Sequence, residues 1–111
     1  MSEQIPKTYP NTNQIRDLRS KIDVIDEQIQ RLINERANIA QQVADIKKQH
    51  EDHPIFYRPE REAQVLKAVM ARNNHLGGVI SDEKMATLFR EIMSVCLDLE
   101  SPRVIAYLGP V

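Results

Sequence analysis

The chain has 111 residues, with 15 basic and 16 acidic side chains and a formal net charge of −1. This length suits one small domain, and the balanced charge gives no field that would attract nucleic acid or an anionic membrane. Three glycines and an aromatic content of 5% speak against a β-rich fold. The abundance of Leu, Ile, Ala, Glu, Gln, Arg and Lys favours an all-α fold instead.

Cysteine usage and hydropathy indicate a cytoplasmic protein without a membrane segment. Cys96 is the single cysteine, so no intrachain disulfide can form, which fits a reducing compartment. No apolar run approaches the length of a membrane span, and Met1 to Asn11 lacks the apolar centre of a signal peptide.

The first predicted helix is very long. Residues 1–11 carry two prolines and no periodicity, and we expect them to form a flexible tail. Asn11, Thr12 or Asn13 can cap a helix that continues without Gly or Pro to about Glu51. Such a helix is about 60 Å long, so its apolar stripe must be covered by another chain, by the later helices, or by both.

Two shorter helices follow a loop at residues 50–57. Pro59 suits the first position of a helix that runs to about Arg72, where the segment at 73–78 (NNHLGG) is expected to end it. Ser81 can cap a third helix, which Pro102 ends. Residues 104–111 (VIAYLGPV) are typical of a strand entering a turn. The predicted organisation is a tail at 1–11, a helical domain at 12–102 and the truncated start of a further domain at 103–111.

One cation interrupts the apolar stripe of the first helix. At alternating spacings of four and three residues, every side chain along this helix is aliphatic except Arg36. The positions are Leu18, Ile22, Ile25, Ile29, Leu32, Arg36, Ile39, Val43 and Ile46. A permanent charge in such a stripe is costly to bury unless an anion meets it. The anion is either a carboxylate of the protein, such as Glu62, or a ligand.

Other charged side chains lie on predicted apolar faces. Lys47 is three turns after Arg36 and points the same way, about 16 Å along the axis. Glu62 opens the apolar face of the second helix, and Glu100 extends the apolar stripe of the third. Arg19 is about 42 Å from Lys47 along the same helix, so the two can share a small ligand only across an antiparallel pair of chains. A solvated helix surface is the alternative for Arg19, Lys47 and Glu100.

Signals for a metal or a cofactor are weak. His50 and His53, with the acidic residues between them, do not have the spacing of a zinc site. No Gly-rich phosphate loop is present, and Cys96 has no base partner in the pattern, which favours a small core residue. We expect neither a metal nor a cofactor.

The order of these motifs resembles the all-helical chorismate mutases over residues 14–101; the motifs are Leu18-Arg19, Asp26, Glu35-Arg36, Lys47 and Arg61-Glu62. The segments at 57–62 (YRPERE) and 106–110 (AYLGP) also look like the mutase part of bifunctional chorismate mutase–prephenate dehydratases, with 103–111 as the start of the dehydratase-like domain. The resemblance implies an intertwined homodimer. It also implies an isomerase that converts chorismate to prephenate in phenylalanine and tyrosine biosynthesis, within the shikimate pathway.

The resemblance further implies a role for each residue of the site. Arg19 from the partner chain and Arg36 would bind the substrate carboxylates, in the bidentate manner that suits arginine. Lys47 would meet the ether oxygen, and Glu62 would hold the ring hydroxyl with Arg61 beside it. Three positions depart from the family pattern: Arg58 stands where an aspartate is frequent, Cys96 where a serine is frequent, and Glu100 where some members have glutamine.

The implied reaction needs no proton transfer and no covalent intermediate. Catalysis would come from selecting the compact substrate conformer and from charges directed at the transition state. Lys47 would stabilise negative charge on the ether oxygen, and a protonated Glu100 would donate a hydrogen bond to it. Two other functions remain open: a non-enzymatic helical dimerisation module, and an isochorismate-pyruvate lyase on the same scaffold.

Overall fold

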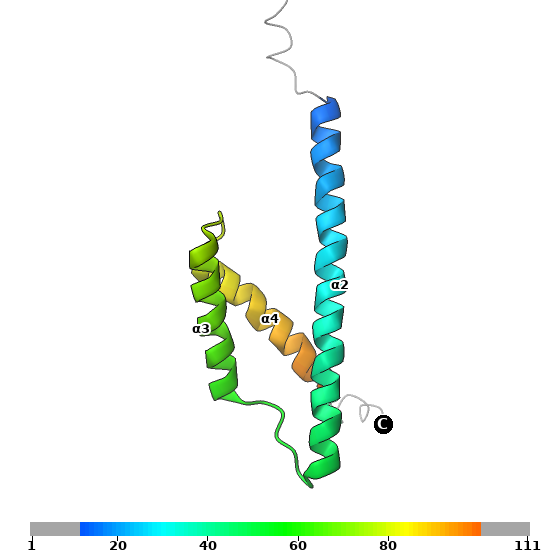
Figure 1. Ribbon diagram of the computed structural model, residues 1–111, viewed down its shortest axis with the longest axis vertical. Coiled ribbons are helices and arrows are strands. Elements are labelled where there is room, and N and C mark those ends of the chain that lie inside the picture. The colour runs from blue at the N-terminus through cyan, green and yellow to red at the C-terminus, as the bar shows by residue number, and fades with distance from the viewer. Residues whose placement is uncertain (1–11, 101–111) are drawn as a thin grey trace, which may run out of the picture. The chain divides into compact units, whose positions relative to one another are not determined.

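The computed structural model describes residues 12–100, which form three α-helices (Figure 1). These are α2 (Thr12–His50), α3 (Pro59–Leu76) and α4 (Asp82–Glu100). Residues 12–100 contain no β-strand, so the prediction of an all-α fold with one very long first helix is confirmed. The predicted tail at 1–11, Pro102 and the predicted domain start at 103–111 lie outside the described residues.

Helix α2 has the predicted bounds to within a residue, and its last turn is closed by a hydrogen bond from the Glu51 amide to the Lys47 carbonyl at 2.8 Å. The chain divides into two compact units, Met1–Asn34 and Glu35–Val111, and the division falls within α2. Each unit is described by itself below.

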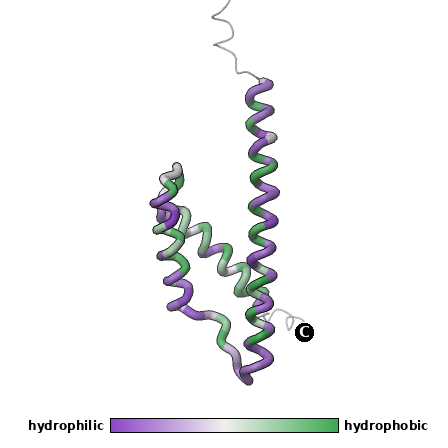
Figure 2. The backbone as a smooth tube through the Cα atoms, viewed as in Figure 1, coloured by the Kyte–Doolittle hydropathy of each residue, from purple (hydrophilic) through white to green (hydrophobic). Residues whose placement is uncertain are grey.

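The described part of the first unit is the helical segment from Thr12 to Asn34. Figure 2 shows apolar positions recurring between hydrophilic ones along α2. The apolar side chains of this segment are exposed, at 58% for Leu18 and 62% for Leu32. The others of the same stripe are Ile22, Ile25 and Ile29. A contiguous apolar surface of this kind is typical of an interaction site.

Helix α3 begins where the sequence predicts. Pro59 occupies the first turn, and Arg58 before it has φ −127° and ψ 101°, the extended conformation that a following proline imposes. The Glu62 amide donates to the Arg58 carbonyl at 3.0 Å. Glu60 and Glu62 lie in the first turn, where the helix dipole favours negative charge.

The predicted end of this helix at about Arg72 is wrong, because α3 continues to Leu76. The sequence predicts that Asn73 helps to end the helix, but its buried side-chain amide donates to the Ile80 carbonyl at 2.9 Å and to Asp82 Oδ1 at 2.8 Å. Its polar group is therefore satisfied across the turn and does not compete with the helix backbone. Gly77, with φ 67° and ψ 33°, ends the helix, and its amide donates to the Asn73 carbonyl.

The predicted cap of α4 is confirmed. Ser81 Oγ accepts a hydrogen bond from the Lys84 amide at 3.2 Å, as an N-cap side chain does. Asp82 and Glu83 follow in the first turn, where their charges are favourable.

The core of the second unit is built from small side chains. Helices α3 and α4 pack against each other, and the buried apolar residues are Ala44 of α2, Val69 of α3, and Ala86 and Cys96 of α4. Larger apolar residues on this unit's part of α2 stay exposed, at 60% for Ile39, 46% for Val43 and 57% for Ile46. Within this unit, the later helices therefore do not bury these three residues of the apolar stripe.

None of the three described helices combines the length and the apolar character that crossing a bilayer requires.

The left-handed conformation of Gly77 predicts a specific cost of substitution. A Cβ at this position would meet no atom within 4 Å, so the cost of Gly77→Ala comes from the backbone, and we expect a loss of about 1 kcal/mol in the free energy of unfolding. Urea denaturation measures it. Gly78→Ala is the matched control, because Gly78 has equally open space and no positive φ. Equal losses in both variants would contradict the assignment of the cost to the backbone.

Candidate functional site

A pocket of about 500 Å³ lies within the second unit. Its walls come from the C-terminal part of α2, the connection at residues 51–58, the first half of α3, and α4 from Arg90 to Glu100. Two acidic side chains, Glu62 and Glu100, line it together with five basic ones: Arg36, Lys47, Arg58, Arg61 and Arg90. Five positive charges minus two negative charges leave an excess of three, so the pocket favours an anion.

Arg36 lies half-buried in the wall formed by α2, and its Nη1 donates to Cys96 Sγ at 3.2 Å. Cys96 is only 1% exposed, and a thiol sulfur is a weak acceptor. The contact positions the guanidinium without neutralising its charge. Within the described chain the hydrogen bond of Arg36 goes to this sulfur, whereas Glu62, the proposed protein partner, accepts from Tyr57. The arrangement leaves the charge of Arg36 available to a ligand.

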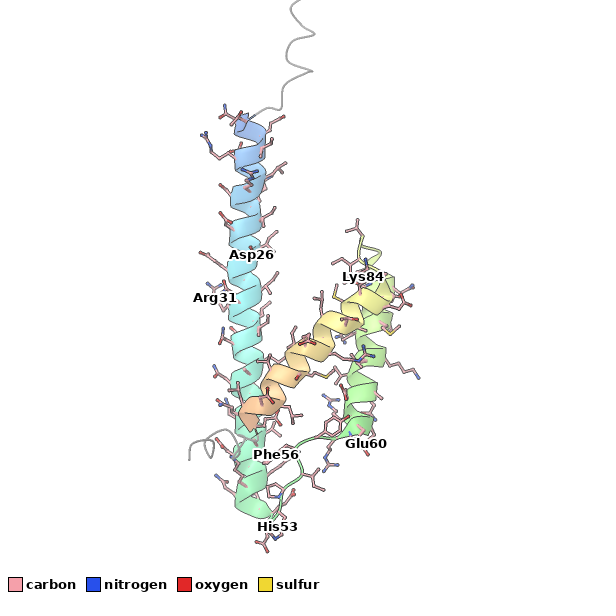
Figure 3. All side chains as sticks on the ribbon, turned by 180° about the vertical axis from the view of Figure 1, so that it is seen from behind. Asp26, Arg31, His53, Phe56, Glu60 and Lys84 are labelled. Atoms are coloured by element: carbon pink, nitrogen blue, oxygen red, sulfur yellow. The ribbon has the colours of Figure 1, made fainter. Side chains whose placement is uncertain are left out.

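Lys47 is held by the connection that follows its helix. Its Nζ donates to the Ile55 carbonyl at 3.1 Å and lies 5.8 Å from the centroid of the Phe56 ring. Lys48 lies at the same distance from that ring, and such contacts between a cation and an aromatic face are attractive. Figure 3 labels Phe56 in the connection, between His53 and Glu60 at the start of α3. An ammonium group has three protons, so Lys47 keeps donors for the pocket.

Glu100 closes the α4 side of the pocket near both cations of α2. Its partial burial raises the pKa of the carboxyl above its ordinary value, and the positive charges of Lys47 and Arg36 oppose this rise. The net shift is upward, so the neutral acid persists to higher pH than for a solvated glutamate. A protonated carboxyl can donate a hydrogen bond into the pocket.

Tyr57 and Glu62 form a pair on the α3 side. The phenol hydroxyl donates to Glu62 Oε1 at 3.2 Å. This hydrogen bond and the negative charge of Glu62 raise the pKa of Tyr57 above its ordinary value, because the phenolate would lose the bond and face a like charge.

The structure brings together seven of the eight residues that the sequence singles out for the site. The pocket is lined by Arg36, Lys47, Arg58, Arg61, Glu62, Cys96 and Glu100. Arg19, the eighth, belongs to the first unit and is exposed on α2. Among residues 12–100, no three His, Cys, Asp or Glu side chains are grouped in a way that could hold a metal ion.

Sequence reasoning missed two of the polar residues in the lining, Arg90 and Tyr57. Arg90 directly follows Phe89 and precedes Met93 by three residues, so it borders the apolar stripe of the third helix, and including the positions next to that stripe finds it. Tyr57 belongs to the family-like segment at 57–62, but nothing in the sequence pattern places its hydroxyl beside Glu62, so the sequence alone assigns it no role in the site.

The arrangement can bind an anion and stabilise negative charge that develops on it. Partly buried cations held by fixed contacts, such as Arg36 and Lys47, act more strongly than cations in water.

Comparison with known proteins agrees with this chemistry. The chorismate mutase type II family model matches residues 18–101. The chain is 52% identical over 101 residues to the bifunctional chorismate mutase/prephenate dehydratase of Pseudomonas aeruginosa, an alignment that covers 88% of this chain and 27% of that protein. It is 42% identical over 98 residues to the protein of the same name from Aquifex aeolicus, covering 87% of this chain and 26% of that one. The chain thus spans about a quarter of the length of these relatives.

A solved structure shares the fold. The chorismate mutase (form II) from Thermus thermophilus superimposes with a TM-score of 0.72 at 31% sequence identity, covering 81% of this chain and 97% of that one. With a family model that matches most of its length and relatives of this identity, the chain belongs to the chorismate mutase type II family.

Proposed function

We propose that this chain is an isomerase that rearranges chorismate to prephenate. The observation that carries the proposal is the half-buried guanidinium of Arg36, whose hydrogen bond within the described chain goes to the Cys96 thiol, in a pocket with an excess of positive charge. Chorismate carries two carboxylates, and the family to which the chain belongs is named for this reaction. Production of prephenate would place the protein in phenylalanine and tyrosine biosynthesis.

In the proposed mechanism the chain's residues bind and orient one substrate molecule. A C–O bond breaks as a C–C bond forms within that molecule, so no nucleophile and no base is required. Arg36 binds one carboxylate and helps to hold the compact conformer, which removes much of the entropic barrier. Lys47 faces the ether oxygen and stabilises its growing negative charge. Glu62 accepts a hydrogen bond from the ring hydroxyl.

Glu100 acts on the same oxygen as Lys47 in this mechanism. As an ionised carboxylate it would repel the developing charge, and as a neutral acid it donates a hydrogen bond. The raised pKa of Glu100 supports this role, since the acid form must be populated near neutral pH.

We further propose that the active species is a homodimer in which Arg19 of one chain completes the site of the other. The support is the exposed apolar stripe of α2, which the described chain leaves uncovered in both units. A dimerisation module without activity would explain this stripe but not the cationic pocket. An isochorismate-pyruvate lyase would explain the pocket, and product identification separates it from the mutase.

The first prediction of the proposed function concerns Arg36. The wild-type chain should consume chorismate, with loss of its absorbance and prephenate as product, and Arg36→Ala should lose at least about 100-fold in kcat/KM. Because the partner of Arg36 is a weak acceptor, the free energy of unfolding should fall by no more than about 1 kcal/mol. Arg72→Ala is the control, since this exposed arginine does not line the pocket. If Arg36→Ala unfolds, Arg36 has a structural role instead.

The second prediction concerns pH. Activity should fall as pH rises through the raised pKa of Glu100, because deprotonation removes the hydrogen-bond donor. Glu100→Gln keeps a donor at every pH and should flatten the decline. The neighbouring charges of Arg36, Lys47, Arg61 and Glu62 are present in both proteins, so the difference between the two profiles isolates Glu100. A wild-type profile that is flat from about pH 5 to pH 8 would contradict the proposed role.

The third prediction tests the shared site. Arg19→Ala and Lys47→Ala should each be inactive, but after subunit exchange the heterodimer contains one intact site. A statistical mixture should then recover about a quarter of the wild-type activity, because half of the dimers are mixed and each has one of two sites.

The matched control mixes Arg36→Ala with Lys47→Ala. Both residues serve the site of their own chain, so each site of the heterodimer stays defective and no activity should return. Absence of recovery in the Arg19 and Lys47 mixture, with subunit exchange verified by mass, would show that Arg19 does not complete a partner's site.

A further inference from the structure

The connection between α2 and α3 contacts two groups of the proposed mechanism, Lys47 and Glu62. Near its middle, the Ile55 carbonyl and the Phe56 ring hold Lys47. At its end, Tyr57 donates to Glu62 Oε1 at 3.2 Å. The mechanism above uses Lys47 and Glu62 but gives no role to the residues that hold them.

The contact to Glu62 restricts a side chain that otherwise has considerable freedom. A glutamate in the first turn of a helix can rotate about three side-chain bonds, so holding its carboxylate in one place costs conformational entropy. Tyr57 lies close to this helix start, five residues before Glu62. Its rigid ring has only two side-chain torsions, so it delivers a donor at a fixed place at small entropic cost.

The contact also gives the two oxygens of the Glu62 carboxylate different roles. An ionised carboxylate only accepts hydrogen bonds, and its two oxygens do so independently. With Oε1 engaged by Tyr57, Oε2 is left to accept the substrate's ring hydroxyl. The hydrogen bond to Glu62 and the charge of Glu62 raise the pKa of Tyr57, so the phenol keeps its proton, and therefore its role as donor, throughout the neutral range.

We propose that Tyr57 is a positioning residue for the mutase reaction, which orients Glu62 Oε2 toward the ring hydroxyl of the substrate. Both residues line the pocket, and Tyr57 is 54% exposed, so its ring contributes little to the packed core. This inference rests on the proposed function, because it assigns Glu62 to the substrate hydroxyl.

The kinetic test uses Tyr57→Phe, which removes only the hydroxyl, with two substrates. The first is chorismate, and the second is an analogue in which hydrogen replaces the ring hydroxyl. For chorismate, kcat/KM should fall by about three- to tenfold, the effect of losing one hydrogen bond to a charged group at an exposed position. For the analogue, kcat/KM should not change.

Two further variants show whether Tyr57 acts through Glu62. In the Glu62→Ala background, Tyr57→Phe should have no further effect, because the group that it positions is gone. Thr87→Val is the matched control. It also removes a hydroxyl, one that donates to the Glu83 carbonyl on an exposed face of α4 outside the pocket, and it should leave kcat/KM unchanged.

A spectroscopic measurement tests the contact without relying on activity. The chain contains three tyrosines, so replacing Tyr9 and Tyr107 by Phe leaves the phenolate absorbance to Tyr57 alone. In that background, Glu62→Gln should lower the pKa of Tyr57, because a neutral amide is a weaker acceptor for the phenol and no longer opposes the phenolate charge. An unchanged titration would overturn the inference, since Tyr57 and Glu62 would then not interact in solution.

The outcomes separate the inference from the function on which it rests. If the wild-type chain does not convert chorismate, the proposed function fails. If it does and Tyr57→Phe matches the wild type for both substrates, the inference alone is wrong. An equal loss for chorismate and the analogue also overturns it, because the role of Tyr57 would then be to support the fold of the pocket and not to orient Glu62.

Discussion

The organisation of the pocket depends on one constraint, the placement of a permanent positive charge in the apolar stripe of α2. Arg36 cannot lose its proton, and burying it without an anion costs free energy. The hydrogen bond of Arg36 goes to a thiol sulfur, which fixes the guanidinium but carries no compensating charge, and the nearby Glu100 has a raised pKa that favours its neutral form. The other charged groups of the pocket are mostly basic, so they favour an anionic ligand as the partner of Arg36.

The two carboxyl groups of the pocket have different surroundings. Glu100 is partly buried, and this desolvation raises its pKa despite the nearby cations. Glu62 lies at the start of a helix, where the dipole favours a negative charge, and it accepts a hydrogen bond from Tyr57. One acid is therefore suited to donating a hydrogen bond and the other to accepting one, which is a common way to obtain two functions from one residue type.

Small core residues and one connection set the geometry of the second unit. Ala44, Val69, Ala86 and Cys96 are its buried apolar residues. Polar side chains beside this core line a pocket of about 500 Å³. The connection at 51–58 then fixes Lys47 from one side and Glu62 from the other. Meanwhile the large aliphatic residues of α2 remain exposed, and this surface is the basis for the proposed dimer.

The sequence by itself determined the local features of this protein. Interactions within a few residues set the helix periodicity, the helix start at Pro59 and the Ser81 cap. The same periodicity shows that Arg36 interrupts an apolar stripe. Tertiary structure decided what depends on contacts between elements. It extended α3 to Leu76 because Asn73 finds its partners across the turn. It also gave Arg36 the Cys96 sulfur, 60 residues away, as its partner, and it placed the Tyr57 hydroxyl on Glu62. Helical spacing shows which side chains share a face, but only the packing of one helix or connection against another shows which of them touch.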